Sequence, residues 1–90
     1  MSFFNKLEFD VMDEVYFISS FEQVMENTGA GKEELREVLL SLLQNNFVQQ
    51  LIYNESLHDF EKLELYNASK MESSSYVATK KGLLAHNSNN

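Results

Sequence analysis

The chain has 90 residues, 43% of them hydrophobic, which is enough for one compact domain with one modest core. Fourteen acidic against seven basic side chains give a net charge of -7, so contact with nucleic acid would need a local basic surface. Cysteine is absent, which excludes disulfides and thiolate metal sites. The start, MSFFNKLEFD, is too polar and too brief for a signal peptide or membrane span. We therefore expect a soluble cytoplasmic protein without membrane contact.

The absence of proline and the presence of only three glycines favour helices whose ends are set by capping residues. A first helix is predicted over residues 5–17, with Asp10, Asp13 and Glu14 facing water. One apolar stripe recurs at helical spacing and should face the core: Phe4, Leu7, Val11, Val15 and Ile18.

The same helix carries a second apolar stripe, formed by Phe9, Met12 and Tyr16, about a third of a turn from the first. One helix seldom buries two stripes in so small a domain. The surplus predicts a homodimer face at these three residues, and the alternative is that the strands or an unassigned segment of the chain cover them.

The segment SSFEQVMENTG predicts a short second helix over residues 21–27. Either Ser19 or Ser20 can cap it, with Glu22 or Gln23 completing a capping box. Gly29 suits the left-handed position that ends a helix.

The segment GAGKEELREVLLSLLQNNF holds the strongest periodic signal and predicts a third helix over residues 32–45. Gly31 is a tolerable N-cap. The residues that should form its wide apolar face are Leu35, Val38, Leu39, Leu42 and Leu43.

Two strands and a last helix are predicted after this point. FVQQLIY, residues 47–53, is rich in strand-forming residues, and YVAT, residues 76–79, forms a second strand. Thr79 can cap a final helix that begins KKGLLAH. We expect a single domain over residues 1–86, followed by a disordered tail, residues 87–90.

Residues 54–75 give conflicting signals. Ser56 and Asp59, with the apolar spacing that follows them, favour a short helix, whereas KLELY alternates like a strand. We expect a short helix followed by a mobile SKMESSS turn.

The order helix, helix, helix, strand, long connection, strand, helix resembles the winged helix-turn-helix family of small bacterial transcriptional regulators. Two segments carry this resemblance: SSFEQVMENTGAGKEELREVLLSLLQNNFVQQL for the helix-turn-helix and outgoing strand, and YVATKKGLLAHN for the return strand and last helix. It implies a mainly α chain with a small β-hairpin, an α+β class, in which a three-helix core carries wing strands and a short C-terminal helix.

The resemblance also implies where contacts with DNA or a partner would lie. The exposed face of the recognition helix would carry five residues: Lys32, Glu33, Arg36, Glu37 and Ser41. Lys70 would lie near the tip of the wing.

Charge weighs against DNA at this face. Residues 1–37 hold nine acidic and three basic side chains, although glutamate can accept a hydrogen bond from cytosine. Two hypotheses follow: a DNA-binding regulator, and an acidic winged-helix module that binds protein, to which a partly exposed Leu40 could contribute. The alternative to any contact surface is that the charged face is simply solvated, with neighbouring lysine and glutamate side chains that stabilise the helix.

Catalysis and metal binding find little support in the sequence. There is no glycine-rich phosphate loop and no serine in a nucleophile elbow, so we expect no enzyme and no cofactor. His58 and His86 do not have metal-ligand spacing and are interpreted as surface histidines. Tyr53, Tyr66 and Tyr76 could form a stacking platform, but strand aromatics more often complete a core.

Overall fold

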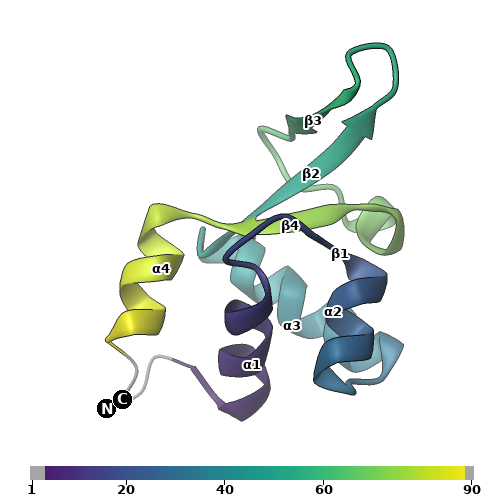
Figure 1. Cartoon of the computed structure of the whole chain (residues 1–90). Helices are drawn as coiled ribbons and strands as arrows, with labels where there is room; N and C mark the ends of the chain where they lie inside the picture. The colour runs from purple at the N-terminus through teal and green to yellow at the C-terminus, as the bar shows by residue number, and fades with distance from the viewer. Residues whose placement is uncertain (1–3, 89–90) are drawn as a thin grey trace.

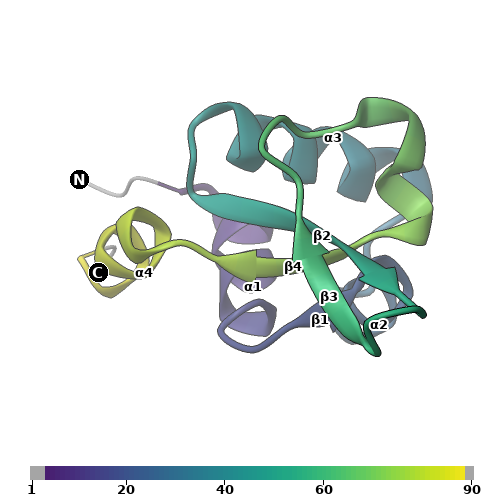
Figure 2. The ribbon, with the colours of Figure 1, turned by 90° about the horizontal axis from the view of Figure 1, so that it is seen from above.

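Three helices, α1 (Lys6–Glu14), α2 (Phe21–Thr28) and α3 (Lys32–Gln44), lie beneath a four-stranded antiparallel sheet in the computed structural model, which describes residues 4–88 (Figure 1). The view from above the sheet shows the strands crossing over these helices (Figure 2). The structure is therefore a small α+β domain of helices and one sheet.

The first helix is shorter than predicted. Asn5 and Glu8 form a capping box at its start, but the helix ends at Glu14 rather than at residue 17. The Ser19 hydroxyl lies 2.8 Å from the Glu14 carbonyl and 3.1 Å from the Phe17 carbonyl, where the chain turns into the two-residue strand β1 (Ser19–Ser20). Ile18, predicted to face the core, is consequently 45% exposed.

The second and third helices confirm their predicted caps. The Ser20 hydroxyl accepts from the Gln23 amide and the Gln23 side chain accepts from Ser20, while Gly29 has φ 73° at the end of α2. Gly31 caps α3 through its backbone conformation alone. Four leucines of α3 are buried: Leu35, Leu39, Leu42 and Leu43.

The strands follow the order β1-β4-β2-β3, with β2 (Val48–Asn54), β3 (Asp59–Lys62) and β4 (Ser75–Ala78) joining β1. Both strands predicted from FVQQLIY and YVAT are confirmed within a residue or two. Gln50 is paired with Tyr76 across β2 and β4, and both side chains are buried. Tyr76 belongs to the main core cluster, so this face of the sheet meets the helices.

Residues 54–75 differ from the prediction. The expected helix is replaced by β3, which pairs with β2 in a hairpin, and the expected mobile turn contains the 3-10 helix η1 (Ala68–Ser73). Two contacts hold this segment. Met71 is 1% exposed in the core, and the buried Gln50 amide donates to the Asn67 carbonyl and the Ser74 hydroxyl.

The last helix, α4 (Lys80–Asn87), begins as predicted, with the Thr79 hydroxyl accepting from the Gly82 amide. Gly82 packs so closely against the chain before β2 that a Cβ here would lie 2.0 Å from the Phe47 oxygen. Asn87, assigned to the disordered tail, instead ends α4, and residues 89–90 of that tail lie outside the described part of the chain.

Candidate interaction surface

The exposed face of α3 is the surface where the resemblance placed most of the candidate contacts with DNA or a partner. Burial of its four leucines on one side leaves Lys32, Glu33 and Glu37 exposed on the other, with Arg36 and Ser41 partly buried at the margin. The predicted contact residues of this helix therefore do share one accessible face.

Both basic residues of this face are occupied by one carboxylate. Glu72, on η1, forms ion pairs with Lys32 at 3.2 Å and with Arg36 through its second oxygen. Arg36 also pairs with Glu33 at 3.2 Å, one turn away. Because each of these bases already faces an acidic group, the α3 surface offers little free positive charge to a phosphate backbone.

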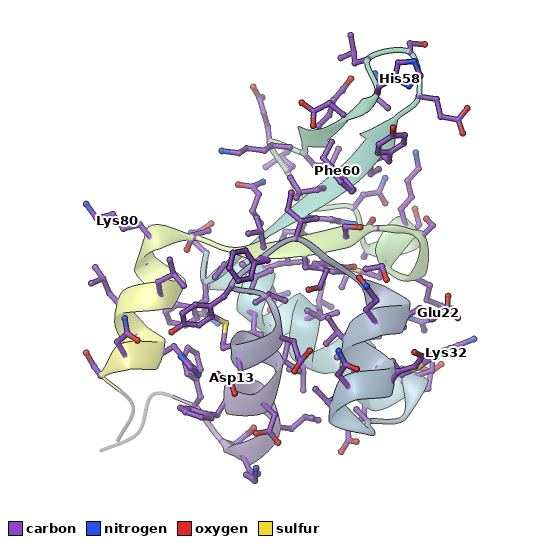
Figure 3. The ribbon with its side chains drawn as sticks, viewed as in Figure 1. Asp13, Glu22, Lys32, His58, Phe60 and Lys80 are labelled. Carbon is purple, nitrogen blue, oxygen red and sulfur yellow. The ribbon has the colours of Figure 1, made fainter. Side chains whose placement is uncertain are left out.

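The resemblance implied that Lys70 lies near the tip of the wing, but in the structure Lys70 is not at the tip of the hairpin. It is an exposed residue of η1, whereas the hairpin turn between β2 and β3 contains His58 (Figure 3). The difference arises because the chain returns from β3 towards the helices, where Met71 enters the core, before it forms β4.

The predicted homodimer face is partly covered by α4, and Tyr16 remains 38% exposed. Met12 is fully buried in the core of its own chain, so it cannot belong to a surface that meets a second copy. Phe9 lies against the His86 ring with centroids 4.2 Å apart, and the Tyr16 hydroxyl is 2.8 Å from His86 Nδ1. The surplus apolar stripe is therefore packed against α4, an element that the sequence-based alternative had not named.

His86 is also a correction, because it is 8% exposed rather than a surface residue. Its Nε2 is buried without a hydrogen-bond partner and lies 3.7 Å from Asp13 Oδ1. The spacing of Gly82, Ala85 and His86, which are buried on one face of α4, is the local signal that could have indicated this.

The second accessible surface is the projecting hairpin and the segment after it, residues 53–66, which we call the arm. Figure 1 shows the hairpin extending away from the helices, and Figure 3 places Phe60 and His58 along it. Tyr53 and Phe60 face each other across β2 and β3, with ring centroids 5.3 Å apart and the rings nearly perpendicular.

The arm contains most of the exposed large hydrophobic side chains in the described part of the chain. Nine such residues are exposed, and five belong to the arm: Tyr53, Leu57, Phe60, Leu65 and Tyr66. Tyr66 keeps a 3.4 Å hydrogen bond with Gln44, which ties the end of the arm to α3. Exposed apolar groups that gather on one element are typical of an interaction surface.

Sequence reasoning missed the arm because its residues were divided between a predicted strand and an unassigned segment. It also missed Glu72, which meets Lys32 and Arg36 only because η1 packs beside α3. The alternation in KLELY was the available signal for strand structure within the arm, although β3 itself lies slightly earlier, at Asp59–Lys62.

Residues 4–88 contain no group of three or more histidine, cysteine or acidic side chains placed to hold a metal ion. Over the same described range, no helix is long and apolar enough to cross a membrane. Comparison of the chain with models of known protein families, with curated proteins and with solved structures gave no match.

Proposed function

We propose that this chain is a non-enzymatic binding module of winged-helix type that recognises a protein partner rather than duplex DNA. The winged-helix assignment rests on the chain order α1, β1, α2, α3 and then a hairpin that projects from the body, followed by β4 and α4. The choice of partner class rests on charge.

The observation that carries this choice is the pairing of Glu72 with both Lys32 and Arg36. A recognition helix needs basic groups for the phosphates that flank the bases it reads. Here those groups are engaged within the chain, and the net charge of -7 supplies no other attraction to a polyanion.

The hairpin supports the same choice. A wing that contacts DNA normally contributes positive charge, yet the hairpin carries Glu55, Asp59 and Glu61 against Lys62. An acidic surface with exposed aromatic side chains is instead compatible with a protein partner, because aromatic groups are enriched in protein interfaces.

DNA binding through α3 is the second candidate, favoured by the succession of α2, a short turn and α3. Fluorescence anisotropy with a labelled random duplex separates the two. We expect the wild-type chain to bind no better than about 10⁻⁴ M at physiological salt, the weak end of non-specific binding. Micromolar affinity at that salt would contradict the proposal.

Two variants sharpen this experiment. Glu72→Gln removes the carboxylate that occupies Lys32 and Arg36, and the combined change Lys32→Ala and Arg36→Ala removes the bases themselves. If α3 were a DNA reader held back by Glu72, the first variant would gain affinity with a steeper salt dependence, and the second would lose binding. We expect all three proteins to bind DNA equally weakly.

The protein partner is tested by affinity capture from lysate of the native host, with and without nuclease treatment, followed by calorimetry with the purified captured protein. Saturable binding that survives removal of nucleic acid supports the proposal. Retention of nucleic acid alone, or capture that disappears after nuclease treatment, would overturn it.

A further inference from the structure

The arm combines exposed apolar side chains with a net negative charge. Besides its five exposed hydrophobic residues it carries four acidic side chains, Glu55, Asp59, Glu61 and Glu64, and one lysine, Lys62. Apolar and acidic residues thus alternate along a segment that stands away from the helices (Figure 1).

The aromatic pair of the arm is already positioned for contact. Tyr53 and Phe60 pack edge to face across the hairpin, and their side chains remain 49% and 36% exposed. Aromatic side chains held in one arrangement lose little conformational freedom on binding, so they make effective anchors.

Strand addition at the hairpin edge is a poorer use of this site. β3 is one of the two edge strands of the sheet, but the Phe60 amide donates to the Asp59 carboxylate at 2.8 Å. That amide is not available to an added strand, and the four-residue edge is short. Recognition at the arm therefore rests on side chains.

Resting on the protein-binding function proposed above, we infer that the arm is the docking surface for a basic amphipathic segment of a partner protein. Apolar residues of that segment would pack on Tyr53 and Phe60, and its lysines or arginines would meet Glu55 in the hairpin turn and Glu64 after β3. Charge complementarity of this kind speeds encounter and fixes orientation.

The same charge argues against other occupants. A second copy of this chain would bring another net charge of -7 to an already acidic arm. Nucleic acid and anionic lipid would be repelled for the same reason.

The test uses the full chain and a defined probe, a helical peptide of leucine and lysine about five turns long, with a leucine and glutamate peptide of equal length as its control. Titration followed by amide chemical shifts gives both the affinity and the location of binding. We expect the lysine peptide to bind with shifts at Tyr53 and Phe60, to weaken as salt is added, and the glutamate peptide not to bind.

Variants separate apolar from charge contacts. Tyr53→Ser combined with Phe60→Ser should weaken the lysine peptide at least about tenfold, as expected for loss of aromatic anchors. Leu84→Ser is the matched control, because Leu84 is 59% exposed but lies on α4. It should leave the affinity unchanged.

The charge variants distinguish the arm from α3. Glu55→Gln combined with Glu64→Gln should weaken binding and reduce its salt dependence, whereas Glu33→Gln combined with Glu37→Gln, an equal charge change on α3, should not. If the α3 pair weakened binding and the arm pair did not, the binding site would lie on α3. That result would overturn this inference but not the proposed protein-binding function.

Three further outcomes would also overturn the inference. Equal weakening by both pairs of variants would mean diffuse attraction to an acidic chain. Shifts at Tyr53 and Phe60 that depend on protein concentration without peptide would make a second copy the occupant. Failure of the lysine peptide to bind at millimolar concentration would remove the site, while a protein partner captured as described above would still support the broader function.

Discussion

Of the three glycines, Gly82 is the one where adding a methyl group should disturb the fold most. A Cβ there would lie 2.0 Å from the Phe47 carbonyl oxygen and 2.9 Å from Met12 Cε. Alanine in place of glycine ordinarily stabilises a helix by about 1 kcal/mol. Here the Phe47 oxygen also accepts from the Thr79 amide at 3.0 Å, so it cannot move away without breaking the hydrogen bond at the start of α4. Overpacking should prevail, and we expect Gly82→Ala to lose about 1 to 3 kcal/mol.

That loss is measurable against a total stability of about 5 to 10 kcal/mol for a domain of this size. Urea denaturation followed by circular dichroism gives the free energy of unfolding for each variant. Gly31→Ser is the matched control, because a Cβ at Gly31 meets nothing within 4 Å and serine is a good N-cap for α3. We expect the control to be as stable as the wild type or slightly more so. A Gly82→Ala variant that matches or exceeds the wild type would refute the close packing of α4 on the chain before β2.

Leu39 is fully buried, so Leu39→Ala should cost about 2 to 5 kcal/mol, and a loss below about half a kcal/mol in urea would place it outside the core. Burial raises the pKa of Tyr76 above its ordinary value of 10.0, while a hydrogen bond with Ser74 acts in the opposite direction. As the pH rises, the Tyr76 phenol therefore loses its proton in the unfolded chain before it does so in the folded chain, so the free energy of unfolding should be constant below pH 10.0 and fall above it. Tyr76→Phe should flatten that fall, and an unchanged slope would contradict the burial of this phenol. Glu72→Gln should cost less than about 1 kcal/mol, because its ion pairs with Lys32 and Arg36 are partly exposed, and a larger loss would show that η1 depends on them.

The elements that sequence reasoning located are those whose signals are local. The caps of α2 need only Ser20, Gln23 and Gly29, all within one short segment. Gly29 adopts its predicted role, and Ser20 and Gln23 are each one of the two predicted alternatives. The leucine spacing of α3 is likewise contained in one helix and finds its buried face directly. Local hydrogen bonds and periodicity can be read without knowledge of the rest of the fold.

The elements it missed depend on distant parts of the chain. Asp59–Lys62 becomes a strand because β2 supplies its backbone partners, which outweighs the helical spacing of the residues around it. The neutralisation of Arg36 comes from Glu72, which lies 36 positions later in the sequence. A helix face can therefore be located from periodicity, but the charge that it presents depends on the neighbouring elements.

His86 shows the same dependence, and its tautomer can be predicted from the groups around its ring. The Tyr16 hydroxyl lies 2.8 Å from Nδ1 and 3.0 Å from Asn87 Oδ1, yet it has one proton and can donate to only one of them. Asp13 Oδ1, 3.7 Å from the buried Nε2, favours a proton on that nitrogen and would repel a lone pair there. We therefore expect Nε2 to carry the proton in the neutral ring, with Tyr16 donating to Nδ1. Long-range ¹⁵N ring correlations distinguish the two tautomers, and Asp13→Asn should weaken the preference. A proton found on Nδ1 in the neutral wild-type ring would refute this assignment and make Tyr16 a donor to Asn87 instead.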